Sequence, residues 1–196
     1  IQTANGEQSP LPVSDCEETA GAARIGLVMN AERGRISRVD LSTGTFIDDD
    51  VFIPGFSPTL LTGRPLAAVP ATDSSAVYVA NSTLPGITRV ETVAVGGVYR
   101  QSEQRLPGVP SDLLIANDEL WVALPDAGAV ARIPLSEFGG LSVVDNFPLP
   151  EGSPFDIAVT EDAQTLYVGH ADVAWLSVVD VTTAAETRRI PLADQC

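Results

Sequence analysis

The sequence predicts an all-β fold of about four four-stranded antiparallel blades, which is the architecture of a β-propeller. A Gly-x-Pro motif recurs about every 44 residues, and each copy is followed by a short strand of the form Tyr-Val-Ala-Asn. From Arg24 onward, short runs of apolar and β-branched residues alternate with turn residues, which is typical of strands. The first motif lies at residues 63–69, 108–114 and 152–158, and the second at 27–30, 78–81, 121–124 and 167–170.

These motifs divide the chain. Residues 1–22 are polar, contain proline, glycine and an acidic cluster, and follow neither the strand nor the helix period, so we interpret them as a leader or tether. The rest is predicted to form the blades, because each pair of motifs marks one four-stranded unit. The predicted blades span residues 23–55, 56–107, 108–151 and 152–196.

The third strand of each blade is the most regular element. Apolar residues alternate along residues 36–40 and their later copies, so one face is predicted to pack on a neighbouring blade. Arg38, Arg89 and Arg132 share the other face, where we expect them to pair with Asp or Glu across strands.

Glycine and proline mark the strand ends. Gly34, Gly86 and Gly128 precede the third strands, where a hairpin turn favours a residue that tolerates positive φ. Proline removes a backbone donor and belongs at the end or edge of a sheet. The fourth strands are therefore predicted to end at residues 53–55, 106–108, 149–150 and 190–191.

The predicted strands are one too few for four complete blades. The chain holds four copies of strands two to four but only three clear copies of strand one. Either residues 8–13 supply the missing inner strand and close a four-bladed ring, or the chain is part of a larger propeller completed by another polypeptide or segment. We favour the incomplete array, because closed four-bladed rings are uncommon.

The strand motifs resemble the YVTN family of β-propeller repeats over residues 24–192. The resemblance implies the propeller fold but not one activity, because members include surface-layer and adhesion proteins, lactonase-like enzymes and propeller subunits of periplasmic redox enzymes. The Asn of the family motif corresponds to Asn30, Asn81, Leu124 and His170. The last two depart from the pattern, so a turn-fixing Asn hydrogen bond is not expected in the third and fourth blades.

Composition narrows the classes of partner. Lys plus Arg total 11 against 26 Asp plus Glu, so the formal net charge is −15. Such a surface repels nucleic acid and anionic lipid, and no apolar run approaches the roughly 18 residues that would favour membrane insertion. Basic proteins, cations and neutral ligands remain compatible with this charge, which also serves solubility.

Cysteine usage points to an oxidising compartment. Cys16 precedes the first strand motif and Cys196 is the last residue, so a disulfide between them would staple the two ends of the array. Two free thiols, or bonds to other chains, are the alternatives. A chain that starts at Ile1 also fits removal of a secretory signal, and we therefore expect a bacterial-type extracytoplasmic protein, periplasmic, cell-surface or secreted.

The loops on one face of the propeller are the candidate binding surface, because loops at the ends of strands carry most propeller ligands and partners. The apolar residues 56–62 lengthen one of these loops and are expected to pack over the channel mouth or to dock on a partner. His170 stands beside Asp172 but serves a turn better than a general base, since no nucleophile motif accompanies it. The candidate face comprises Asn30, Glu32, Arg33, Phe56, Leu60, Arg64, Asn81, Asp126, His170 and Asp172.

The sequence predicts no cofactor and no metal site, because two cysteines and one histidine do not make a closed metal centre. We interpret the chain as a non-catalytic interaction or structural module, in a larger assembly with another protein. The alternative is a lactonase-like hydrolase or a propeller subunit of a periplasmic oxidoreductase.

Overall fold

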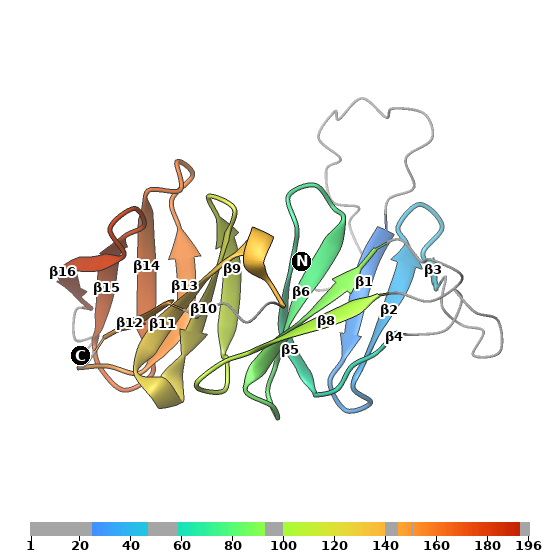
Figure 1. Cartoon of the computed structure of the whole chain (residues 1–196), viewed down its shortest axis with the longest axis horizontal. Coiled ribbons are helices and arrows are strands. Elements are labelled where there is room, and N and C mark those ends of the chain that lie inside the picture. The colour runs from blue at the N-terminus through green and yellow to red at the C-terminus, as the bar shows by residue number, and fades with distance from the viewer. Residues whose placement is uncertain (1–24, 47–58, 93–99, 140–144, 150, 193–196) are drawn as a thin grey trace, which may run out of the picture.

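A computed structural model of the chain describes residues 25–46, 59–92, 100–139, 145–149 and 151–192. Their strands form four antiparallel sheets that lie side by side along the long axis of the molecule (Figure 1). The sheets follow one another in chain order, and the first and fourth stand at opposite ends of the row. The predicted all-β architecture of about four propeller blades is confirmed.

Three of the blades have the complete order of four strands, from the inner strand to the outer one. The second blade is β5(Pro65–Pro70), β6(Ala76–Asn81), β7(Gly86–Glu91) and β8(Gln101–Arg105). The third is β9(Asp112–Ala116), β10(Glu119–Leu124), β11(Ala129–Pro134) and β12(Asp145–Pro148), with short 3₁₀ turns η1(Pro125–Ala127) and η2(Leu135–Glu137). The fourth is β13(Pro154–Val159), β14(Thr165–His170), β15(Trp175–Asp180) and β16(Ala185–Pro191).

The first blade is built differently. β1(Ile25–Asn30) pairs with β2(Arg35–Asp40), and two short strands, β3(Thr45–Phe46) and β4(Thr59–Leu60), pair with opposite ends of the same edge of β2. β3 and β4 are therefore two parts of one outer strand, separated by residues 47–58. The register of β1 on β2 matches that of β6 on β7, so β1 is the second strand of its blade.

The described outer strand of the first blade reaches Leu60, beyond the predicted strand end at residues 53–55, while the predicted blade limits stay predictions. Leu60 belongs to this strand and not to the loop to which the sequence assigned it. In each blade a leucine directly follows the outer strand, and in the first blade this leucine is Leu61. The position of Leu61 therefore explains why the strand ends at Leu60. In each blade the amide of this leucine donates a hydrogen bond of 2.8–2.9 Å to a backbone carbonyl at the turn before the third strand. The pairs are Leu61 with Gly34, Leu106 with Pro85, Leu149 with Gly128 and Leu192 with Ala174.

The core lies between blades and follows the alternation of side chains along each second strand. In β10, Leu120, Val122 and Leu124 pack against the second blade, whereas Trp121 and Ala123 pack against the fourth. All five are fully buried. Burying one large apolar side chain stabilises the fold by about 1.5–3 kcal/mol, so each blade depends on the neighbour that covers it.

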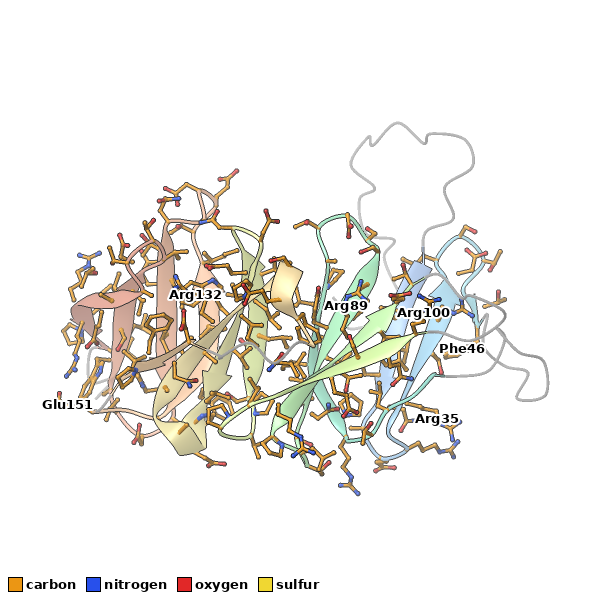
Figure 2. All side chains as sticks on the ribbon, viewed as in Figure 1. Arg35, Phe46, Arg89, Arg100, Arg132 and Glu151 are labelled. Carbon is orange, nitrogen blue, oxygen red and sulfur yellow. The ribbon has the colours of Figure 1, made fainter. Side chains whose placement is uncertain are left out.

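Arg132 pairs with carboxylates across strands as predicted, whereas Arg89 pairs with Glu91 of its own strand β7, and Figure 2 shows the two arginines on neighbouring sheets. Arg89 lies 3.1 Å from Glu91, and Arg132 lies 3.1 Å from Asp145 and 3.6 Å from Glu119 across the sheet. The Arg132 guanidinium also lies over the Trp121 ring, 5.9 Å from its centroid. Arg132 therefore lies on the same face as Trp121, beside the interface with the fourth blade.

Candidate functional site

The turns between second and third strands lie beside the linkers between blades, as the candidate face requires. In the second blade, the Arg64 amide donates to the Thr83 hydroxyl at 3.2 Å. In the fourth blade, the Ala171 amide donates to the Ser153 carbonyl at 2.9 Å, and the Ser153 amide donates to the Asp172 carboxylate at 2.7 Å. Arg64 and Asp172 are therefore exposed residues of linker and turn segments that are hydrogen-bonded together.

The remaining predicted residues differ in their hydrogen bonds and exposure. Asn30 fixes its own turn, because its side-chain carbonyl accepts a hydrogen bond from the Arg33 amide at 3.0 Å. Glu32, Arg33 and Asp126 are exposed in turns of the first and third blades. Phe56, Cys16 and Cys196 lie outside the described residues, so their predicted roles stay predictions.

His170 belongs to a chain of polar groups that crosses the fourth blade. Its Nε2 lies 2.8 Å from the Ser177 hydroxyl, which donates to the Glu186 carboxylate at 2.7 Å. Arg189 binds the same carboxylate at 2.9 Å and lowers the pKa of Glu186, and it also pairs with Glu151. Burial lowers the pKa of His170, although Asp172 and Glu186 oppose that shift.

This chain combines His, Ser and Glu, but not in the order of a catalytic triad. A triad needs a carboxylate on the second ring nitrogen of the histidine and an accessible hydroxyl. Here the carboxylate accepts from Ser177, His170 Nδ1 is buried without a partner, and Ser177 is only 1% exposed. The arrangement therefore supports the structural role that the sequence favoured for His170.

The second blade holds a related pair. Asn81, only 3% exposed, donates from its side-chain amide to the Thr88 hydroxyl at 2.9 Å, while its carbonyl oxygen is buried without a partner. Asn81 and Thr88 line a pocket of about 360 Å³ with residues of the β6–β7 turn and β8. The sequence did not identify Thr88 and Ser177 as partners of Asn81 and His170. Each lies seven residues after its partner, and this common spacing is the signal that could have found them.

The innermost strands bring two carboxyl groups together. Asp112 on β9 accepts a hydrogen bond from the Ile157 amide on β13 at 3.0 Å. Burial raises the pKa of the Asp112 carboxyl, and a side-chain hydrogen bond with Asp156 raises it further. A carboxyl pair of this kind holds a proton above the usual range of an aspartate.

The described part of the chain contains no group of three or more His, Cys, Asp or Glu residues with the arrangement of a metal site. It also contains no helix with the length and apolar character needed to cross a bilayer.

Solved structures similar to this chain are propeller proteins. Hydrazine synthase of Kuenenia stuttgartiensis matches with a TM-score of 0.71 and 14% identity over 86% of this chain and 46% of that one. The dihydro-heme d1 dehydrogenase NirN matches with a TM-score of 0.66 and 14% identity over 86% and 35% of the two chains. A 6-phosphogluconolactonase-like protein of Bacteroides uniformis matches with a TM-score of 0.63 and 14% identity over 88% and 56%.

At this level of identity the comparisons support the fold alone. The chain spans between about a third and just over half the length of these three structures. No family model and no curated protein matches the sequence.

Proposed function

We propose that this chain is a non-catalytic propeller module of YVTN-type repeats that acts outside the cytoplasm and binds another protein in a larger assembly. One observation carries the proposal. Within the described residues no strand pairs with the inner edge of β1, whereas β6, β10 and β14 are each paired there by an inner strand.

The side chains of β1 are correspondingly exposed. Leu27 and Val28 are 40% and 44% exposed, while Val79, the residue of β6 that matches Val28, is fully buried. A strand with an unpaired edge and apolar side chains on both faces is a template for another strand. We therefore assign the inner edge of β1 as the docking site.

The opposite end of the row presents a second uncovered surface. Tyr167 of β14 occupies the place of Tyr78 and Trp121, which are 3% and 0% exposed because the next blade covers them. Tyr167 is only half-buried, with no further blade beside it among the described residues. This flank supports a larger propeller in which further blades follow the fourth.

The chemistry of β1 identifies the partner segment as an extended strand. Strand addition uses backbone hydrogen bonds for affinity and alternate side chains for specificity. The inner strands of the other blades carry apolar residues facing their neighbours, and a partner strand needs the same pattern. Because the chain has a net charge of −15, basic residues beside that strand would favour association.

A peptide with the β13 sequence, residues 154–159, flanked by lysines, tests this proposal. We expect saturable binding that slows hydrogen exchange of β1 amides and leaves β6 amides unchanged. The control peptide has the same side chains but N-methyl groups on alternate backbone amides, and it is expected to bind at least about tenfold more weakly. Equal binding of both peptides, or no protection of β1, would refute strand addition.

The proposed location has its own test. In an oxidising compartment we expect Cys16 and Cys196 to form one intramolecular disulfide. The intact mass of protein purified from a periplasmic or secreted fraction would then rise by about 2 Da on reduction. An unchanged mass would contradict the predicted staple.

A propeller enzyme, or a propeller subunit of an oxidoreductase, is the second candidate function. It is favoured by the descriptions of the similar structures, which name a hydrazine synthase, a dehydrogenase and a lactonase-like protein. Asp112 and Asp156 are the carboxyl pair with which we associate this alternative, because the pKa of Asp112 is raised by burial and by its hydrogen bond with Asp156. Stoichiometric divalent metal bound by these carboxylates in the purified protein would favour the enzyme over the interaction module.

A further inference from the structure

We propose that two copies of this chain join head to tail into one ring of eight blades. In this ring the outer flank of each first blade packs against the outer flank of the other copy's fourth blade. The outer flank is the sheet face that no described blade covers, at either end of the row. Propellers typically have about four to eight blades, so two copies reach a number that closes. The inference rests on the proposed larger assembly and names its partner, but it does not depend on strand addition at β1.

The outer flank of the first blade carries exposed apolar side chains. Ile36 packs against the second blade, so Val28 and Val39, at the alternate positions of the paired strands, point away from it. Val28 is 44% exposed, and Val39 pairs with Phe46 of β3, which is 54% exposed and lies at the outer end of the row (Figure 2). Leu41, directly after β2, is 60% exposed. Large apolar side chains on this flank therefore lie open to solvent.

The same positions are buried in the fourth blade, where a neighbouring blade covers them. The register of β1 on β2 matches that of β14 on β15, which identifies the corresponding residues. The pairs are Val28 with Val168, Val39 with Val179, and Leu41 with Val181. The three valines are at most 2% exposed and pack in the core between the third and fourth blades. The first blade thus presents the surface with which a blade packs on the one before it.

The outer flank of the fourth blade presents the complementary surface. In the third blade, the residues that pack against those valines include a tryptophan, a valine and a phenylalanine. The corresponding pairs are Trp121 with Tyr167, Val130 with Leu176, and Phe147 with Ile190. The fourth blade therefore keeps an aromatic residue and two large apolar residues at these positions, and all three are only half-buried. Each end of the row lacks the surface that the other end offers.

Two copies satisfy both ends at once. A head-to-tail contact between identical chains forms a ring when its rotation closes and an open filament when it does not. A ring of two copies covers every outer flank, whereas an open row leaves an apolar flank exposed at each end. Because each copy has a net charge of −15, apolar contact has to overcome repulsion between the copies. Salt that screens this repulsion is therefore expected to strengthen the association.

Sedimentation equilibrium of the full chain tests the ring at protein concentrations of about 1–100 μM. The buffer is reducing, so that neither cysteine links two copies. We expect a species with twice the mass of the chain, formed more readily at about 0.5 M than at about 0.05 M salt. A monomer throughout this range, or open polymers that lengthen with concentration, would overturn the proposal.

Two substitutions locate the contact. Leu41→Asp alters the flank of the first blade, and Ala158→Asp alters that of the fourth, where Ala158 is exposed and pairs with Tyr167. Both residues are exposed in the single chain, so the variants are expected to fold, which circular dichroism checks. Each should weaken the dimer at least about a hundredfold, because each change occurs in both contacts of the ring. Leu84→Asp, at a residue 41% exposed in a turn of the second blade, is the control and should leave the dimer unaltered.

A mixture of the two variants separates a head-to-tail ring from other dimers. A ring of one Leu41→Asp copy and one Ala158→Asp copy has one contact with both changes and one with neither. We expect mixed dimers to form more readily than dimers of either variant alone. A mixture no better than the separate variants, or dimers unaffected by both changes, would refute the ring.

The ring and the proposed function fail separately. Monomers that still bind the β13 peptide at β1 would refute the ring and leave strand addition standing. Dimers that do not bind this peptide would refute strand addition and leave the ring standing.

Discussion

The His170 ring nitrogen Nε2 lies 2.8 Å from the Ser177 hydroxyl, and this pair takes the place in the fourth blade that Asn81 and Thr88 take in the second. The two blades thus use different side chains for one task, which is to join the end of the second strand to the third. The buried polar atoms left over, His170 Nδ1 and Asn81 Oδ1, face the linker glycines Gly152 and Gly63.

The first prediction concerns the pH dependence of His170. Burial lowers its pKa, so the folded protein favours the neutral ring. The stabilisation is then present above the ordinary histidine pKa of about 6.5 and is lost as the pH falls through the lower folded value. Urea unfolding between about pH 5 and 8 should show this decline, and His170→Asn should remove it. An identical decline in the variant would assign the effect to other groups.

The second prediction concerns the carboxyl pair. The raised pKa of Asp112 means that the folded state holds a proton which the unfolded chain has released. Stability is therefore fully present below the ordinary aspartate pKa of about 3.9 and declines as the pH rises through the folded value. Asp156→Asn removes the neighbouring charge and should lower the pKa of Asp112 in a carboxyl NMR titration. A pKa that stays unchanged would exclude Asp156 as a cause.

The blade arrangement predicts which aromatic residues stabilise the fold. Trp121 is fully buried between the third and fourth blades and its ring stacks on Phe147, with 5.7 Å between centroids. Trp121→Ala should cost about 3–5 kcal/mol in the free energy of unfolding. Phe155 is 54% exposed, so Phe155→Ala serves as the control and should cost less than about 1 kcal/mol. Equal losses in denaturant unfolding would contradict packing between blades.

The fourth prediction uses the contact between Gly152 and His170. A Cβ at residue 152 would overlap with the His170 ring, so Gly152→Ala should destabilise the protein by about 1–3 kcal/mol. In a His170→Ala background the ring is absent and most of that loss should disappear. A double-mutant cycle measures this coupling, and additive effects would show that the ring and the glycine do not meet.

The repeat made the fold predictable, because side-chain alternation recurs in each blade and a turn glycine precedes the third strand in the first three blades. Gly34 and Gly128 have the expected positive φ of 57°. Gly86 does not, and is required instead because a Cβ there would lie 2.9 Å from the Gln104 carbonyl oxygen. Only the neighbouring strand creates that constraint, so a local turn rule could not identify it.

The candidate site was less accessible to sequence reasoning. The end of the first outer strand was predicted from Pro54, because proline is a local signal for a strand end. The role of Leu61 depends instead on its packing against other strands, which the local sequence does not reveal. The partners Thr88 and Ser177 depend on strand register, and the pocket depends on a missing volume beside Asn81. None of these is encoded by a motif of adjacent residues.

The central claim is that the described strands form propeller blades in a row, and that none of them pairs with the inner edge of β1. Residue-resolved hydrogen exchange of the isolated chain tests it most directly. We expect alternate amides of β1 to exchange rapidly, while the matching amides of β6, β10 and β14, which face an inner strand, are protected. Equal protection of alternate amides in all four strands would mean that the edge of β1 is already paired within the chain, and would contradict the account.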